Sequence, residues 1–372
     1  MAVEKDAIVG NAKARHIEYA KHLENLYIIV KTPKNIKSKI IKIKDNLFIY
    51  PTASLNKYLF LYDAYSLGLR ICKENRIDFI ATQDPFITGL IGWLLKKKYK
   101  IPLNIQVHGD MIDNKYFIKE NVFNFFLNKL AKLIIGKADT IRVVTLRQRE
   151  RPTLKGIDKE KIHYVPSFID FSLFSQRNDN SVRKLNLNSR FDKIVLSVSR
   201  LAKEKSIETL IRAIPYVIED YPRCLFLIIG GGPEEKYLEG LASQLGVKEF
   251  IKFQGPVSYK DIPSYFQAAD IFISTSHYEG TCMSIHEAAV AKKPIISTPH
   301  AGAYDALKNG HTGFIVNFDD YLGLSKNILY LLENDNIAKD MGSNAHTFII
   351  EHFKKEDILK RYCHLWEQTK GC

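Results

Sequence analysis

The sequence predicts an α/β protein made of two Rossmann-like halves whose parallel sheets face each other across a cleft. The chain has 372 residues, which is long for a single hydrophobic core. Short apolar segments rich in β-branched residues alternate with amphipathic helical stretches, as in parallel sheets covered by helices. A polar stretch without periodicity, residues 174–193, separates two sets of such segments.

We therefore expect one domain over residues 1–180, a second over 181–352, and a final helix over 353–372 that packs back on the first domain. Buried strands are expected where runs such as "LYIIVKT" and "KIVLSVS" occur. In the first half these runs are 26–32, 78–82, 102–108 and 140–145. In the second half they are 193–199, 224–230, 250–255, 271–275 and 294–298.

The cysteines and the apolar segments indicate the cellular compartment. Five cysteines form no CxxC pair, which fits a reduced protein without a zinc site. The first residues, "MAVEKDAIVG", lack the apolar core of a signal peptide, and the longest apolar stretch, 85–95, is too short to span a bilayer. We expect a cytoplasmic protein, with peripheral binding to the inner face of the membrane as an option.

The charge is distributed unevenly. The whole formal net charge of +13 lies in residues 1–180, and the rest of the chain is neutral overall. Such asymmetry indicates an anionic partner for the first half only. Stretches 89–102 and 121–138 mix aromatic, aliphatic and lysine residues at helical spacing, which is usual for sheet-covering helices. The same pattern is typical of a surface that binds anionic lipid. Phe123, Phe126, Trp93 and Lys96 are among the residues concerned.

Two glutamates stand near the end of an expected strand in the second half. Glu279 follows the run "ADIFIST", and Glu287 lies among small residues in the helix that begins near Ser284. Ligands of open α/β sheets bind at the carboxyl ends of the strands, and the free N–H groups of a helix start favour anions there. Alone, Glu287 is equally explained as an acidic residue near a helix start.

Two cations are expected at the same edge. Arg200 and Lys205 lie between a strand and a helix in "SVSRLAKEKSIETL". Unpaired cations are unfavourable near a helix start, so an anionic ligand explains them better than a solvated surface. A glycine turn, "GGGP", follows the next strand, and a further strand ends at Gly255.

Taken together, these motifs resemble glycosyltransferase family 4. The pattern RLxxxK, the turn GGGP, the run FxGxV followed by YFxxADIFIxxS, and a pair of glutamates separated by seven residues occur in the family's order. Members are retaining enzymes of the GT-B fold that use nucleotide-sugar donors. The resemblance covers roughly residues 78–320.

The resemblance assigns roles in donor binding and catalysis. It implies that Arg200 and Lys205 hold the donor diphosphate without metal, that Glu287 accepts the ribose hydroxyls, and that Glu279 contacts the transferred sugar. Backbone near Gly255 would meet the base. Backbone N–H groups would line the sugar and the phosphates at Gly280, Thr281, Cys282, Met283 and Ser284.

In the first half, the resemblance points to His108 and Gly10. His108 closes the strand "NIQVH" in a polar turn and is expected near the sugar and the acceptor. The family opens with a strand and a loop of two glycines near the phosphates, whereas only Gly10 stands here. The segment 164–170 resembles the family's "PNGVD", but Ser167 replaces asparagine, so no ligand role is assigned there.

The predicted function is a retaining transfer of a hexose or N-acetylhexosamine from a UDP-sugar to a cell-envelope glycan or lipid-linked acceptor. No metal or other cofactor is expected, and GDP-mannose remains open as donor. An inverting GT-B enzyme or a sugar epimerase of the same architecture is the main alternative. A nucleic-acid-binding protein leaves the glutamates unexplained, and a dehydrogenase would need a GxGxxG turn that "AIVGNAKARH" lacks.

Overall fold

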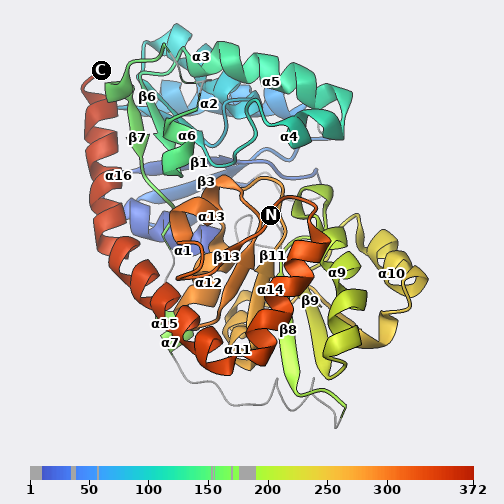
Figure 1. Cartoon of the computed structure of the whole chain (residues 1–372). Coiled ribbons are helices and arrows are strands. Elements are labelled where there is room, and N and C mark those ends of the chain that lie inside the picture. The colour runs from blue at the N-terminus through green and yellow to red at the C-terminus, as the bar shows by residue number, and fades with distance from the viewer. Residues whose placement is uncertain are drawn as a thin grey trace.

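The computed structural model describes residues 11–34, 39–56, 58–151, 154, 156–168, 171–175 and 190–372. Two α/β halves lie one above the other, and the last helix runs along one side of both (Figure 1). Gly10 and most of the predicted linker lie outside the described residues.

Within its described residues, the first half forms seven strands in two sheets. One sheet has the order β1-β3-β2 and the other β4-β5-β6-β7. All pairs are parallel except β2 with β3, which form an antiparallel hairpin. The strands are β1 (Leu26–Val30), β2 (Ile41–Lys44), β3 (Leu47–Pro51), β4 (Ile80–Thr82), β5 (Leu103–Val107), β6 (Thr140–Val143) and β7 (Ile162–Tyr164).

Helices α4, α5 and α6 of the first half begin where asparagine or threonine side chains accept backbone hydrogen bonds. Asn114 caps α4, Asn121 caps α5, and Thr145 forms a capping box with Gln148 at the start of α6. The helices are α1 (Asn11–Ala20), α2 (Phe60–Glu74), α3 (Ile87–Tyr99), α4 (Lys115–Glu120), α5 (Val122–Ile135) and α6 (Leu146–Arg149).

The second half is built on one parallel sheet of order β10-β9-β8-β11-β12-β13. Residues of β8, β9, β11 and β12 are almost all buried, as expected of strands covered on both faces. The strand order reverses between β8 and β11, which lie side by side. The strands are β8 (Lys193–Val198), β9 (Cys224–Ile229), β10 (Ile251–Gly255), β11 (Ile271–Ser274), β12 (Ile295–Ser297) and β13 (Phe314–Ile315).

The remaining helices cover this sheet, and the last one returns to the first half. They are α7 (Ser172–Ser175), α9 (Ile207–Asp220), α10 (Glu235–Gln244), α11 (Ile262–Ala268), α12 (Met283–Val290), α13 (Ala301–Ala306), α14 (Tyr321–Glu333), α15 (Asp335–His352) and α16 (Lys355–Lys370). Near the end of α16, the Thr369 hydroxyl lies 2.6 Å from that of Thr140 on β6, and Lys370 pairs with Asp78 at 3.3 Å.

Every strand expected from the sequence has an observed counterpart, shorter by one or a few residues. Parallel pairing was expected throughout, and the hairpin of β2 and β3 is the exception. Strand β2 was not predicted; its sequence "IKIK" lies at a sheet edge with both lysines exposed. Strand β3 and the short strands β7 and β13 were also missed.

Candidate active site

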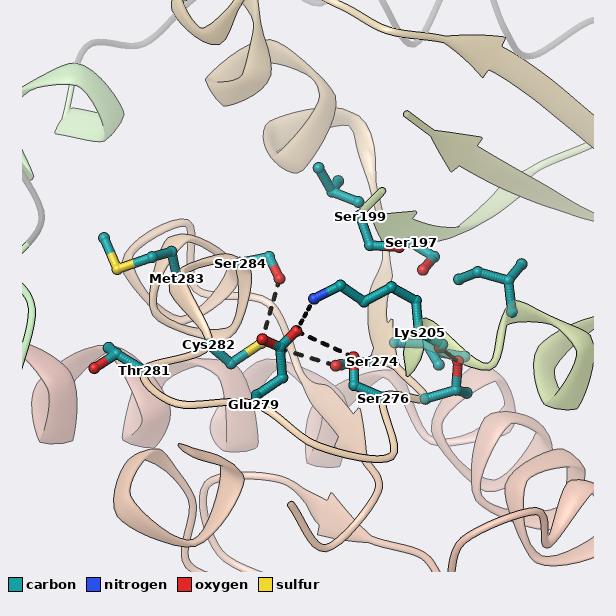
Figure 2. A pocket seen from close by; sticks show the side chains of 14 residues that line it. Ser197, Ser199, Lys205, Ser274, Ser276, Glu279, Thr281, Cys282, Met283 and Ser284 are labelled. Atoms are coloured by element: carbon teal, nitrogen blue, oxygen red, sulfur yellow. Dashed lines mark hydrogen bonds and ion pairs between the residues drawn. The ribbon is translucent and has the colours of Figure 1, made fainter. Parts of the chain in front are cut away.

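A cavity of about 230 Å³ opens at the carboxyl ends of β8 and β11. This is the point where the strand order reverses, and ligands of open α/β sheets bind at such points. Figure 2 shows the side chains that surround the cavity. They belong to Ser197, Val198, Ser199, Lys205, Ile207, Ile273, Ser274, Thr275, Ser276, Glu279, Thr281, Cys282, Met283 and Ser284.

An ion pair between Lys205 and Glu279 lies at the centre of the cavity wall (Figure 2). Both side chains are largely buried, with 17% and 20% of their surfaces exposed. Burial acts to lower the pKa of Lys205, but Glu279, helped by Cys282 and Glu204, outweighs it and raises the pKa above its usual value. Ser276 donates a hydrogen bond of 3.2 Å to the same carboxylate. The pair is therefore a fixed charged group in a small cavity.

Arg200 lies outside the cavity, although the sequence led us to expect both cations at one crevice. Its guanidinium pairs with Glu204, four residues along, and its side chain is 65% exposed. Of the two predicted cations, Lys205 lines the cavity and Arg200 does not. The predicted role of Arg200 at the diphosphate stays a prediction.

Helix α12 begins at the cavity without a side-chain cap. Its first residues, Met283 and Ser284, line the wall together with Thr281 and Cys282. Uncapped N–H groups at a helix start bind anions well. Burial raises the pKa of the Cys282 thiol to about 11, so this cysteine stays protonated near neutral pH and is a poor nucleophile.

Gly280 is needed because another backbone passes against it. A Cβ atom at this position would lie 1.7 Å from the carbonyl oxygen of His108, in the first half. A Cβ on Gly302 would lie 2.0 Å from the oxygen of Gly280. Gly280 itself is not part of the cavity wall. Its role in the structure is to let the loop that carries Glu279 touch the other half.

The glycine turn after β9 serves packing in the same way. A Cβ on Gly230 would lie 1.9 Å from the oxygen of Ser199, and Gly232 similarly abuts Leu201. Gly255, at the end of β10, has a φ of +73° with open space around it, so it is required by backbone conformation. Neither Gly255 nor the turn lines the cavity.

Glu287 is buried in α12 and does not line the cavity, whereas Ser284, one turn earlier, does. Burial raises the pKa of its carboxyl to about 7, and the Tyr259 side chain acts in the opposite direction. Glu287 therefore changes its charge near physiological pH. Its predicted contact with a ribose remains a prediction.

His108 follows the end of β5 and meets the second half through its backbone, beside Gly280. Its ring Nε2 lies 3.0 Å from Oε1 of Gln106. Burial and the nearby Arg142 guanidinium lower its pKa well below the usual value, so the ring is neutral at pH 7. The ring does not line the cavity.

Residues that the sequence did not single out bring α4 of the first half against the loop of Glu279. The Tyr278 hydroxyl donates a 2.7 Å hydrogen bond to Glu120, and its ring packs edge-on against Phe117. The His277 ring stacks on Tyr116 at 4.0 Å. The aromatic run in α4 and the residues "HY" before Glu279 were the available signals, but neither indicates its partner.

Comparison with known families identifies the chain. The model of the glycosyl transferases group 1 matches residues 179–348, and the model of Glycosyltransferase Family 4 matches residues 28–173. The chain belongs to glycosyltransferase family 4. It is therefore a glycosyltransferase, and the alternatives of a dehydrogenase and a nucleic-acid-binding protein are set aside.

The chain is similar to glycosyltransferases with different names. An alpha-monoglucosyldiacylglycerol synthase of Acholeplasma laidlawii is 27% identical over 290 residues, which cover 74% of this chain and 72% of the relative. An N-acetyl-alpha-D-glucosaminyl L-malate synthase of Bacillus anthracis is 22% identical, over 87% of this chain and 84% of the relative.

Solved structures share the fold. The HepE protein of Anabaena, solved with UDP and glucose, matches with a TM-score of 0.74 and 19% identity, over 86% of each chain. The sucrose-phosphate synthase of Thermosynechococcus elongatus matches with a TM-score of 0.82 and 20% identity, over 97% of this chain and 94% of the other. The fold is GT-B, as the sequence predicted.

Among the described residues, no group of three or more His, Cys, Asp or Glu side chains is arranged to hold a metal ion. Within the same ranges, no helix is both long and apolar enough to cross a bilayer.

Proposed function

We propose that this enzyme transfers a hexose or an N-acetylhexosamine from a UDP-sugar to a cell-envelope glycan or lipid-linked acceptor, with retention of the anomeric configuration. The observation that carries the proposal is the Lys205–Glu279 pair, which stands in a cavity beside the uncapped start of α12. A nucleoside diphosphate needs a cation and backbone hydrogen-bond donors, which Lys205 and the first N–H groups of α12 supply. A sugar needs an acceptor for its hydroxyl groups, which Glu279 supplies.

In the proposed complex the diphosphate exchanges places with Glu279 as the partner of Lys205. The ammonium and the N–H groups of α12 then stabilise the charge that develops on the departing nucleotide, with Arg200 joining from Glu204. Because these groups replace a metal ion, activity is expected to survive chelation by EDTA.

Released from Lys205, Glu279 is free to accept hydrogen bonds from the transferred sugar. We assign it an orienting role. The bond from the anomeric carbon to the diphosphate breaks, and the bond to the acceptor oxygen forms on the same face. The acceptor proton passes to the departing phosphate oxygen. His108 would approach the sugar from the first half.

The nucleoside is placed by residues beyond the cavity wall. Glu287, in its ionised form, would accept both ribose hydroxyls, and backbone near Gly255 would meet the base. Support for UDP comes from two matching folds solved with it, HepE and TarM of S. aureus. The test is a screen of UDP-, GDP- and ADP-sugars by calorimetry and by turnover. If none of the UDP-sugars binds, the donor assignment is wrong.

An inverting transferase or an epimerase of the same fold is the second candidate. Both would use the same diphosphate site, so donor binding does not separate them from the proposal. The configuration of the product at the anomeric carbon does. The NMR coupling constant of the anomeric proton in the first-formed product reports this configuration. A retained configuration supports the proposal. An inverted configuration, or conversion of the donor sugar into its epimer, excludes it.

A lipid-linked acceptor is supported by the exposed face of α5. Val122, Phe123, Phe126 and Leu133 are exposed there, Phe123 by 60% and Phe126 by 59%. Phe125 is also exposed, and the Lys129 ammonium lies 4.6 Å from its ring centre. Exposed aromatics beside lysines are typical of helices that bind anionic membranes.

The position of this face relative to the cavity strengthens the case. Helix α5 begins two residues after Glu120, which holds Tyr278 next to Glu279. A lipid headgroup at the membrane surface would thus lie near the transferred sugar. Lys96, singled out from the sequence, is less suited, because it pairs with Asp139 at 2.5 Å. Trp93 packs against the core of the first half.

Liposome sedimentation tests the membrane proposal. We expect binding to rise with anionic lipid content and to fall with salt, since surface charges are screened beyond about 8 Å at physiological ionic strength. Phe123→Ser with Phe126→Ser should release the protein while leaving nucleotide binding intact. Leu322→Ser, at an exposed apolar residue of the second half, is the matched control. Equal sedimentation with neutral and anionic liposomes would contradict the proposal.

A further inference from the structure

A buried arginine in the first half lacks a carboxylate partner. Arg142, on β6, is 0% exposed, and no ion pair with an acidic side chain is formed within the described residues. Its guanidinium donates to the carbonyl of Val165 at 2.7 Å and to Oε1 of Gln106 at 2.7 Å. It also lies over the Tyr362 ring at 4.5 Å. A buried, unneutralised cation is costly, so it calls for a functional explanation.

The arginine decides which way the Gln106 amide faces. A guanidinium has only donors, so the amide atom 2.7 Å from Nη1 of Arg142 has to be the carbonyl oxygen. The opposite orientation would bring two donors together. The side chain of Gln106 is itself buried, which leaves it little freedom to turn away.

The amide oxygen in turn decides the tautomer of His108. This oxygen lies 3.0 Å from Nε2 of His108 and accepts there as well. Because an acceptor faces it, Nε2 has to carry the proton, and Nδ1 keeps its lone pair. Nη1 of Arg142 is 3.4 Å from Nε2, which is consistent with Nε2 not acting as its acceptor. Nδ1 of His108 has no hydrogen-bond partner among the described residues. It is also not one of their fully buried polar atoms, so a ligand can reach it.

We propose that Arg142 and Gln106 are positioning residues that hold His108 as its neutral Nε2–H tautomer, so that Nδ1 accepts a hydrogen bond from a sugar hydroxyl. The last step rests on the proposed function, because it requires a sugar between the two halves. The first step concerns the free protein alone. Neither Arg142 nor Gln106 is needed to touch the substrate.

The charged groups around His108 agree with this assignment. Arg142 on β6 and Arg15 with His16 on α1 all act to lower its pKa, and burial is the largest cause. No acidic side chain is recorded as acting on it in the described part of the chain. A cationic surrounding excludes the imidazolium form and leaves a neutral acceptor.

The hydrogen-bonded chain from Arg142 through Gln106 to His108 is called the relay below. NMR of the ring nitrogens of full-length, ¹⁵N-histidine-labelled protein tests it without any ligand. His108→Asn assigns the signal. We expect Nδ1 to show the shift of an unprotonated nitrogen and Nε2 that of a protonated one, unchanged from pH 8 to about pH 6. The opposite tautomer, or a protonated ring at neutral pH, would overturn the relay whatever the enzyme's activity.

Variants then connect the relay to turnover. Gln106→Leu should produce a mixture of tautomers and lower kcat/KM roughly tenfold, the upper end for loss of one neutral hydrogen bond. Gln106→Glu keeps an acceptor for both neighbours but adds a negative charge. It should preserve the tautomer, raise the pKa of His108 and move the acidic limb of the pH–rate profile to higher pH.

The matched control is Asn104→Leu, which removes another buried amide from the same face of β5. Asn104 bonds to Thr140 at 2.9 Å and does not contact His108. It should leave the His108 signal unchanged. The same tautomer in wild type and in Gln106→Leu would refute the relay. A shifted tautomer with unchanged kcat/KM would uphold the relay and instead refute the placement of His108 at the sugar.

Discussion

The two halves present different groups at the carboxyl ends of their strands. The second half forms a cavity of about 230 Å³ with an ion pair, hydroxyl groups and a helix start in its wall. In the first half, a much smaller cavity of about 20 Å³ lies beside Asp110, whose carboxylate already pairs with Arg151. On the proposed function, donor recognition would lie in the second half, whereas acceptor recognition would depend on the surface of the first half and on the space between the halves.

The largest effect is expected from the cation inside the donor cavity. Lys205→Ala should lower kcat by roughly 10² to 10³ and change the donor KM less, because charge on the leaving diphosphate grows in the transition state. Arg200→Ala should act in the same direction. Lys203→Ala, at an exposed position of the same segment, is the control.

Steady-state kinetics in EDTA measures this prediction. An equal loss in Lys203→Ala would show that the effect is not specific to the cavity. Strict dependence on a divalent metal would contradict charge stabilisation by the protein alone.

The second prediction concerns Glu287 and pH. Its pKa is raised to about 7, so the carboxyl is neutral below that pH and ionised above it. If ribose binding needs the ionised form, UDP affinity should rise as pH increases from 6 to 8, with a proton released on binding near pH 7. Glu287→Gln should bind roughly 10- to 100-fold more weakly at pH 8, since each charged hydrogen bond contributes about 1.5–3 kcal/mol.

Calorimetry in buffers of different ionisation enthalpy detects that proton. Glu287→Gln should lose the pH dependence, whereas Glu239→Gln, at an exposed residue of α10, should retain it. Unchanged affinity for UDP, GDP and ADP in the Glu287 variant would remove the ribose assignment.

The smallest effect is expected at the contact that joins the halves. Tyr278→Phe removes the hydrogen bond to Glu120 and loosens the loop of Glu279. We expect kcat/KM to fall roughly three- to tenfold, in line with about 0.5–1.5 kcal/mol for one typical hydrogen bond. Glu120→Gln combined with Tyr278→Phe should cost no more than the larger single change. Fully additive losses would mean that the two side chains act separately.

The sequence predicted the parts of this molecule that local patterns determine. Buried strands such as β8 and β9 consist mostly of apolar residues, and the motifs that contain Lys205 and Glu279 are short stretches that can be read from the sequence. The hairpin of β2 and β3 was missed, although the alternation of isoleucine and lysine in β2 has the period of two that an edge strand requires.

Contacts between distant segments were beyond the reach of local patterns. Nothing in "RLAKEK" indicates that Glu204 pairs with Arg200 while Lys205 turns toward Glu279. Arg142 reads as a polar residue in a strand, and only the fold brings Gln106, His108 and Tyr362 around it. The role of Tyr278 likewise depends on its hydrogen bond to Glu120 in α4, which lies far away in the sequence.

The close approach at Gly280 sets a rule for engineering donor choice. Here the carbonyl of His108 and the backbone near Gly302 enclose a glycine that has no room for one methyl group. A combinatorial library aimed at bulkier sugars can therefore vary Thr281, Met283 and Ser284, whose side chains face the cavity. Positions 280 and 302 should stay fixed, because a side chain at 280 would clash with the His108 carbonyl of the first half and one at 302 would clash with the Gly280 backbone. Either change would displace the loop of Glu279 for every donor alike.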